Sequence, residues 1–475
     1  MRKLLPVAAL SAAALVCAPW VAYATTGGSV SPTPASWTPS IATTSTDGTT
    51  EEIRQLTACG DGNMYAVGQF SSIKQGANSY TRNNVFSFSA TSGAMTTFNP
   101  NVNGKVDTIA LSPDCSTAYL GGSFSSVNGT SVQNIAAVNV ATNTVVSSFG
   151  HSASAEVYTL LLTNNHLIAG GKGYLAGTTN KYMASLNPTT GTDDGYIHLG
   201  ISGHYVFTED NGTPSGSNPT NVYNLSLSPT GTKLLAMGDF TSVGGTARRQ
   251  IFMLDLGATT TAVDNWYSRE FNQNCNWNEA FWLQDASWSP DGSTIYTAAT
   301  GYKPATDNNP TALGNDPNTG VTTGNMTTEP RGGLCDAAAA FASTVTAATP
   351  VPNHKWVQYT GCDSLYSTAV DPADGSVYVG GHHRWLDNPL QCDNNNNGTA
   401  VTDPGIGGLD PSTGHAYTTS SALQGKYIRS RGTGADDEVV TPQGLWIASD
   451  NGTASGSSQT CGGVTGHAGL CLLPH

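Results

Sequence analysis

A short motif that recurs along the chain constrains the fold more than any other feature. Residues 65–72 read YAVGQFSS, residues 119–126 read YLGGSFSS and residues 235–242 read LAMGDFTS. Weaker copies begin near residues 167, 296, 378 and 446, which makes seven copies. Each copy follows an alternating segment and a turn such as Ser112-Pro113-Asp114. Repeats of this length indicate units that bury their apolar faces against one another rather than independent domains.

The strand pattern within each repeat indicates the architecture. Four short antiparallel strands in roughly 60 residues, repeated seven times, are typical of a seven-bladed β-propeller. The fourth strand is expected to carry an aromatic residue, as at Phe98, Phe149, Trp266 and Trp356. The last copy stops after a third strand at 470–474, while Ser36-Trp37-Thr38-Pro39 resembles the fourth-strand segment 97–100. We therefore predict an all-β fold whose N-terminal strand completes the last blade.

Composition supports an acidic, β-rich protein. Charged residues make up 11% of the chain, against about 25% in an average protein, and the formal net charge is −14. Scarce Glu, Lys and Arg disfavour long helices. An acidic chain without a basic patch also lacks the electrostatic footprint that nucleic-acid binding requires, so we expect no nucleic-acid partner.

The first 24 residues have the features of a signal peptide. Arg2 and Lys3 precede an apolar stretch, and Ala22-Tyr23-Ala24 forms a small-residue cleavage site. We therefore expect residues 1–24 to be removed and residues 25–475 to form one propeller domain. The predicted location is extracellular, and no later apolar run is long enough for a transmembrane segment.

The cysteines fit an oxidising compartment. Eight remain after Cys17, an even number, and no C-x-x-C pair suggests zinc. Spacing alone leaves 105 pairings open. Alignment of the repeats favours Cys59–Cys115 as a bridge between neighbouring blades and Cys461–Cys471 across one hairpin. It also favours Cys275–Cys335 beside blade five, and Cys362–Cys392 in the blade six insertion.

The repeat motif resembles a known family. Residues 121–129, GGSFSSVNG, and residues 237–245, MGDFTSVGG, are similar to the delta-60 repeat of secreted actinobacterial β-propellers. The segment 379–411 also resembles these proteins. The resemblance implies a propeller fold and an extracellular life. It implies no particular activity and no catalytic residue.

Candidate ligand-binding residues gather in the long loops of blades five to seven. Function commonly resides in loops that a rigid scaffold positions. Aromatic rings can stack on sugars, while carboxylates and Arg can bind hydroxyls. The alternative is that these side chains only pack the loops. The residues that we single out are Trp277, Tyr302, His382, Trp385, Asp387, Arg429, Arg431 and Asp437.

Four further residues are candidates for catalysis. His383 aligns with Phe70, Phe124 and Phe240, and a His in a core position needs a polar partner. It is either a buried structural residue or a general base, and Arg384 beside it could neutralise a uronate. Asp285 and Glu279 could serve as a carboxylate pair for glycoside hydrolysis. A structural role, in which strand-start Asp residues bind loop amides, is the alternative.

One segment resembles a calcium loop. Asp393, Asn395 and Asn397 follow the spacing of the first EF-hand ligands, but Pro404 occupies the position of the twelfth-residue Glu. An Asn-rich loop is the simpler interpretation, and we expect no cofactor and no other metal.

Three functions follow from these observations. The first is recognition of an extracellular polysaccharide or cell-surface glycan by the loops of blades five to seven. The second is a carbohydrate-active enzyme on the same face, either a polysaccharide lyase or a glycoside hydrolase. The third is a structural or protein-interaction propeller without a small-molecule site. The sequence leaves open whether the chain is an enzyme.

Overall fold

The chain folds almost entirely into β-strands. A computed structural model describes residues 30–31, 33–42, 51–204, 206–208, 214–217, 219–272, 283–301, 334–389, 398, 400–417, 428–429, 434–450, 460–461 and 464–475. Within these ranges the one helix is the 3₁₀ turn η1 (Arg269–Asn272). No described helix is long and apolar enough to cross a membrane.

Seven antiparallel sheets of three or four strands form the body of the described structure. In chain order they are β2 (Glu52–Ala58), β3 (Asn63–Gln69) and β6 (Val85–Ser89); β7 (Lys105–Leu111), β8 (Thr117–Ser123) and β11 (Ile135–Asn139); β12 (Val157–Thr163), β13 (His166–Tyr174) and β14 (Lys181–Leu186); β18 (Asn224–Leu227), β19 (Lys233–Met237), β22 (Ile251–Leu256) and β23 (Thr261–Val263); β24 (Leu283–Trp288), β25 (Thr294–Ala299), β26 (Ala337–Ala342) and β27 (His354–Tyr359); β28 (Leu365–Val370), β29 (Val377–Gly381) and β32 (Ile406–Leu409); and β34 (Ala435–Thr441), β35 (Gly444–Ser449) and β38 (Leu470–Pro474).

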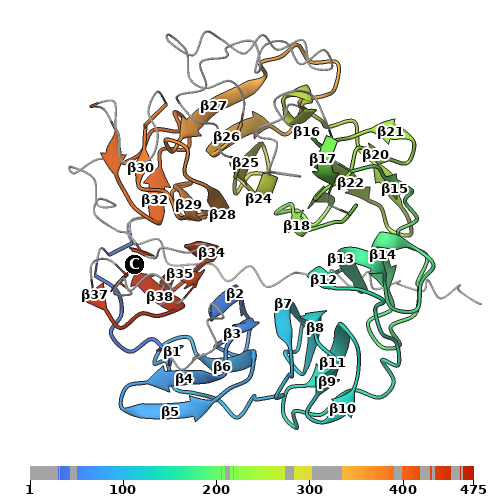
Figure 1. Ribbon diagram of the computed structural model, residues 1–475, viewed down its shortest axis with the longest axis vertical. Helices are drawn as coiled ribbons and strands as arrows, with labels where there is room; N and C mark the ends of the chain where they lie inside the picture. The colour runs from blue at the N-terminus through green and yellow to red at the C-terminus, as the bar shows by residue number, and fades with distance from the viewer. Residues whose placement is uncertain are drawn as a thin grey trace, which may run out of the picture.

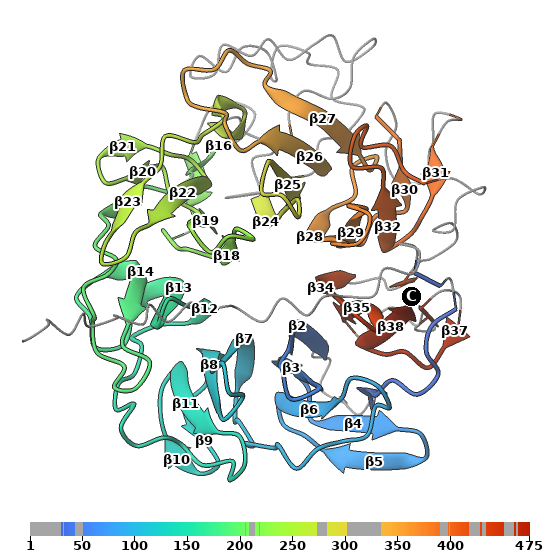
Figure 2. The same cartoon turned by 180° about the vertical axis from the view of Figure 1, so that it is seen from behind.

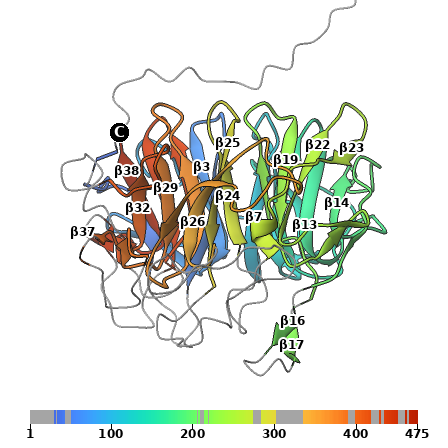
Figure 3. The ribbon, with the colours of Figure 1, turned by 90° about the horizontal axis from the view of Figure 1, so that it is seen from above.

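The sheets are arranged around a common centre, as in a β-propeller. Figure 1 shows the first strand of each sheet nearest the centre and the later strands farther out. The view from behind shows the same arrangement, with β34 and β2 side by side (Figure 2). Seen from the side, the strands run roughly along the central axis (Figure 3). The prediction of an all-β, propeller-like fold is confirmed at this level.

Apolar cores lie between neighbouring sheets. Tyr65 and Val67 of β3 share a core with Val106 and Ile109 of β7, and similar clusters join each sheet to the next. The last sheet also packs on the first, because Trp446 of β35 shares a core with Ile53 of β2. Each sheet is therefore covered on both faces by its neighbours, and its second strand is buried along most of its length, as in β3, β8 and β35.

The expected fourth strand forms a full ladder in two of these sheets, where β23 and β27 pair with the third strand. Elsewhere the corresponding segment makes a single bridge, such as Phe88 with Met95 and Val138 with Val145. The segment after Met95 soon reaches Asn99-Pro100, and a proline cannot donate to a ladder. Phe98 nevertheless lies in the core between the first two sheets, where its ring meets Tyr65 edge-on.

The N-terminal segment lies along the last sheet. The backbone N–H groups of Ser31, Ala35 and Ile41 donate to the carbonyls of Pro474, Leu472 and Ala468, at 2.5, 2.9 and 2.7 Å. The Trp37 ring packs edge-on against Trp446, with 5.9 Å between the ring centroids. The segment therefore occupies the position that the sequence assigns to a fourth strand beside β38.

Two of the expected disulfides are present among the described residues. Cys59–Cys115 joins the first two sheets, and Cys461–Cys471 joins residues ten apart in the last repeat. Cys335 and Cys362 are each disulfide-bonded. Cys275 and Cys392, which we expected as their partners, lie outside the described residues, as does the expected signal peptide 1–24.

Short two- and three-stranded sheets lie in the connections between the strands of the seven main sheets. They are β1 (Ser40–Ile41) with β4 (Ser72–Gln75) and β5 (Asn78–Thr81); β9 (Ser126–Val127) with β10 (Thr130–Ser131); β15 (Ile201–Ser202) with β20 (Ser242–Val243) and β21 (Thr246–Ala247); β16 (Val206–Thr208) with β17 (Pro214–Ser217); β30 (Trp385–Leu386) with β31 (Val401–Thr402); and β33 (Ile428–Arg429) with β36 (Thr460–Cys461) and β37 (Val464–Thr465). Most of them connect the second and third strands of a sheet.

Candidate functional site at the centre of the ring

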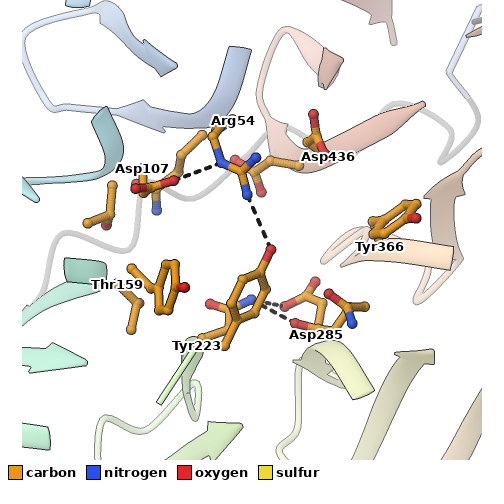
Figure 4. Close-up of a pocket in the computed structure, with 13 residues that line it drawn as sticks. Arg54, Asp107, Thr159, Tyr223, Asp285, Tyr366 and Asp436 are labelled. Atoms are coloured by element: carbon orange, nitrogen blue, oxygen red, sulfur yellow. Dashed lines mark hydrogen bonds and ion pairs between the residues drawn. The ribbon is translucent and has the colours of Figure 1, made fainter. Parts of the chain in front are cut away.

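A polar pocket lies where the innermost strands converge. Figure 4 shows side chains from separate sheets pointing toward one another across it, including Arg54, Tyr223, Tyr366 and Asp436. Every one of the seven innermost strands, or the residue just before it, contributes to the lining. The lining residues are Arg54, Gln55, Asp107, Thr108, Tyr158, Thr159, Tyr223, Asn224, Gln284, Asp285, Tyr366, Asp436 and Asp437.

A β-bulge at the same place in the innermost strands explains why consecutive residues line the pocket. In a regular strand neighbouring side chains point to opposite faces. Here the pairing register shifts around Arg54, Asp107, Tyr158, Gln284, Tyr366 and Asp436, so that an extra residue is inserted at each position. Because of the bulge, the inserted residue and the residue after it can both face the centre.

The repeat glycine makes room for this bulge. A Cβ atom on Gly122 would lie 2.2 Å from the carbonyl oxygen of Lys105, two residues before the bulged Asp107. Equivalent clashes, at 2.0 to 2.4 Å, would arise at Gly68, Gly171, Gly238 and Gly381. At these five positions the glycine lets the neighbouring strand approach closely, whereas Ala299 and Ser449 stand at the equivalent places of the fifth and seventh sheets.

A belt of hydrogen bonds links the innermost strands to one another. Gln55 Oε1 accepts from the Ile109 N–H at 2.6 Å, and Thr108 Oγ1 accepts from the Leu160 N–H at 2.9 Å. Asp437 Oδ2 accepts from the Leu56 N–H at 2.8 Å, which ties the last sheet to the first. Gln55, Thr108 and Asp437 therefore fix the neighbouring strand as well as lining the pocket.

Alternating charges occupy the wall formed by the first three sheets. Arg54 lies 2.8 Å from Glu52 and 3.0 Å from Asp107, and its Nη2 donates to the Tyr223 hydroxyl at 3.3 Å (Figure 4). Lys105 pairs with Asp107 at 3.0 Å and with Glu156 at 2.7 Å. Burial raises the pKa of Asp107 to about 6, although Arg54 and Lys105 oppose the shift.

The fifth and seventh sheets contribute carboxyl groups that form no ion pair with a Lys or Arg among the described residues. Burial raises the pKa of Asp437 to about 7, and the nearby Asp285 adds to the shift. Burial also holds the pKa of Asp436 well above its usual range, and Arg54 opposes this only in part. Asp436 Oδ2 is inaccessible to solvent and has no hydrogen-bond partner. These groups can hold protons at neutral pH and so act as donors as well as acceptors.

Two of the residues predicted from sequence lie in this pocket. Asp285 and Asp437 both line it, at equivalent positions after the bulge. Asp285 Oδ2 accepts from the Thr368 N–H at 2.8 Å, and its Oδ1 accepts from Asn224 at 2.8 Å. His382 lies nearby: its ring meets the ring of the pocket residue Tyr366 edge-on, with 5.7 Å between the ring centroids.

Three other predicted residues lie in the segment between β29 and β32, and none of them lines the central pocket. Arg384 is 3.5 Å from Asp363, and Trp385 is half-buried in β30. Asp387 accepts from Gln358 Nε2 at 2.8 Å, and its Oδ1 lies 2.9 Å from His415 Nδ1. These contacts tie Asp387 to its neighbours.

Several candidates fall outside the described residues. They are Trp277, Glu279, Tyr302 and Arg431, together with the proposed calcium ligands Asp393, Asn395 and Asn397. Arg429 lies in β33, where the backbone alone is described. Among the described residues, the one cluster with metal-ligand types is Cys59, Asp61 and Cys115, whose cysteines form a disulfide with each other.

His383 occupies the core position that the alignment assigns to it. The side chain is 1% exposed, and neither ring nitrogen makes a hydrogen bond of normal geometry. Burial lowers the pKa of His383 to about 3, with His382 adding to the shift and the Asp403 backbone opposing it. A neutral, enclosed imidazole that makes no hydrogen bond of normal geometry fits the structural interpretation of this residue better than the role of a general base.

Replacing His383 by phenylalanine should stabilise the protein by about 1 kcal/mol, because it removes two unpaired buried nitrogens and restores the residue of the other repeats. His166→Phe is the matched control and should destabilise, since His166 Nδ1 lies 2.6 Å from Asp194 Oδ2. Chemical denaturation of both variants measures the difference. A loss of stability in His383→Phe would contradict the structural interpretation.

The sequence interpretation missed most of the pocket. Arg54, Asp107, Tyr158, Tyr223 and Tyr366 were not candidates, although each follows an apolar residue at one fixed position of its repeat. An alignment centred on that position shows polar or aromatic side chains in all seven copies. This recurrence is the sequence pattern that points to the pocket.

No family model and no curated protein sequence matches the chain. Among solved structures, hydrazine synthase of Kuenenia stuttgartiensis is similar over 86% of this chain and 94% of its own, with 13% sequence identity and a TM-score of 0.41. A likeness at that score carries no argument about function. The delta-60 resemblance therefore stays a prediction from the repeat motif.

Proposed function

We propose that the chain is a secreted seven-bladed β-propeller of the delta-60 type that binds an extracellular glycan in its central pocket. In this proposal the N-terminal segment completes the seventh blade, and the wall formed by blades five to seven makes the main contacts. The observation that carries the proposal is the ring of bulged side chains, which brings hydrogen-bonding groups from every innermost strand to one point.

The chemistry of the lining suits a polyhydroxylated ligand. Sugar hydroxyls both donate and accept hydrogen bonds, and the pocket offers both functions through amides, carboxyls and phenols. Tyr158, Tyr223 and Tyr366 add aromatic rings on which the C–H face of a sugar can stack. The net charge of −14 again argues against a nucleic acid as the ligand.

A second candidate function is a carbohydrate-active enzyme, either a glycoside hydrolase or a polysaccharide lyase. The observation that favours it is the pKa of Asp437, which burial raises to about 7, and that of Asp107, raised to about 6. A general acid or base works best when its pKa lies near the working pH. Both carboxyls line the same pocket, so binding and catalysis would share one site.

A glycan array with the full mature protein tests the proposal, followed by calorimetry with the best ligand. We expect Tyr366→Ala and Asp436→Asn to weaken binding about tenfold or more, the scale of one lost polar contact in a binding site. Tyr174→Ala and Asp114→Asn are matched controls, because both side chains are exposed outside the pocket. Pocket variants that bind like the parent would rule out this site.

An activity assay on the bound glycan separates the two functions. Release of reducing ends indicates a hydrolase, and release of unsaturated uronates indicates a lyase. If the protein is an enzyme, Asp437→Asn should abolish turnover while ligand still binds. Binding without any product under these conditions supports recognition alone.

A further inference from the structure

The charges around the pocket are unevenly balanced. On the side of the first three sheets, three cations face three carboxylates. Arg54, Lys105 and Lys172 are each within 3.0 Å of Glu52, Asp107 or Glu156. These cations are therefore already neutralised, and none of them has charge to spare for an anionic ligand.

The fifth and seventh sheets contribute an excess of acids. Asp285, Asp436 and Asp437 line the pocket, and no Lys or Arg forms an ion pair with them among the described residues. Two of Asp285's contacts are an amide side chain and a backbone N–H, both uncharged. Asp436 Oδ2 is enclosed and has no hydrogen-bond partner. The charge of Arg54 also acts on Asp436, but Arg54 already lies within 3.0 Å of Glu52 and Asp107. A further positively charged group that donates several hydrogen bonds would balance these carboxyls.

We infer that the pocket takes a primary ammonium group on a sugar, the chemistry of a de-N-acetylated amino sugar unit, held between Asp436, Asp437 and the ring of Tyr366. The inference rests on the proposed function and names its ligand class. An ammonium group offers three donors to carboxylate acceptors. A tyrosine face adds cation–π attraction. The hydroxyls of the same sugar would reach Gln284 and Asn224, which are uncharged.

Acidic sugars fit this arrangement poorly. A uronate would place a second negative charge beside Asp436 and Asp437. It could be neutralised by Arg54 alone, and Arg54 already lies within 3.0 Å of Glu52 and Asp107. A neutral N-acetylated sugar would leave Asp436 Oδ2 without a charged partner. The charge balance therefore selects the amine over both alternatives.

Binding of a cation should also release protons. Burial raises the pKa of Asp437 to about 7 and holds that of Asp436 well above its usual range, so both carboxyls can hold protons at neutral pH before the ligand arrives. A positive charge within a few ångströms favours the ionised form and expels the proton. The charged and titratable neighbours are Arg54, Glu52, Asp107, Tyr223, Asp285, Glu438 and Asp450.

The experiment compares fully deacetylated chito-oligosaccharides with their fully N-acetylated forms by titration calorimetry. Measurements at a pH about one unit below the amine pKa, in buffers of different ionisation enthalpy, count the protons released. We expect the deacetylated form to bind at least about tenfold more tightly, with net proton release. Asp436→Asn should abolish that preference and the proton release, and Asp114→Asn should leave both unchanged.

The possible outcomes separate this inference from the proposed function. Equal affinity for the two forms, or tighter binding of an oligouronate, would overturn the amine assignment while glycan binding stands. Spermidine binding as tightly as the amino sugar would overturn the assignment to a sugar. If no glycan binding responds to Tyr366→Ala or Asp436→Asn, the proposed function itself fails. A preference retained in Asp436→Asn would reject the place assigned to the ammonium.

Discussion

Deletion of residues 36–41 is expected to destabilise the whole protein by about 4 kcal/mol or more. The deletion removes Ile41, which is 3% exposed, and Trp37, which packs on Trp446 in the core between the last and first sheets. Truncation of one buried large side chain typically costs about 3–5 kcal/mol. The deletion also leaves β38 as an unpaired sheet edge. Equilibrium unfolding in guanidinium chloride measures the loss.

Two point variants refine this test. Ile41→Ala should lose about 2–4 kcal/mol, because it leaves a cavity beside Ala468 and Leu470. Ser36→Ala is the matched control in the same segment, and its exposed side chain predicts a change within about 0.5 kcal/mol. A deletion protein that melts within a degree or two of the parent would show that the N-terminal segment does not stabilise the fold.

Replacement of Glu438 by leucine is expected to stabilise the protein by about 1–3 kcal/mol. Glu438 of β34 occupies the position held by Leu56, Ile109 and Leu160 in the first three repeats. It is 5% exposed, and neither carboxyl oxygen has a hydrogen-bond partner. Leucine would fill the space of the Glu438 side chain without burying an unpaired polar group.

The pH dependence of stability provides an independent signature of this residue. Burial holds the pKa of Glu438 well above its usual range, with the charges of Asp437 and Asp285 adding to the shift. Because the folded state binds the proton more tightly than the unfolded state, this contribution is fully present below the unfolded pKa. It is lost as the pH rises toward the folded pKa, by up to about 1.4 kcal/mol per pH unit for one proton.

Glu438→Gln separates the titration from the packing. Glutamine keeps the shape and the unpaired polar atoms of Glu438 but cannot ionise. The unfolding free energy of Glu438→Gln should therefore fall less steeply with rising pH, by the contribution of one proton. Its stability should increase less than that of Glu438→Leu. Asp436 and Asp437 will still contribute a slope, since burial raises the pKa of each. Denaturation midpoints of parent and both variants between weakly acidic and weakly alkaline pH check this. Parallel profiles for parent and Glu438→Leu would contradict a buried proton on Glu438.

The sequence by itself determined the repeating architecture. The recurring glycine–aromatic motif predicts sheets that stack on one another, and the structure places those copies in successive sheets around one centre. Repeat alignment also predicted two bridges: Cys59–Cys115, because equivalent turns of neighbouring repeats lie side by side, and Cys461–Cys471, because the two residues flank one hairpin. Local periodicity and repeat alignment suffice for such features, since they depend on strands that are near in sequence.

The central pocket was decided by the tertiary structure alone. Arg54 and Tyr223 are 169 residues apart, and the hydrogen bond between them exists because the ring brings the first and fourth repeats together. The bulges also matter, because alternation would predict that only one of two neighbouring residues, such as Asp436 and Asp437, faces the centre. Sequence alone could show that these positions are polar. Whether a carboxyl meets a cation depends on which strands face it across the pocket, and that is fixed by the arrangement of the sheets around a common centre.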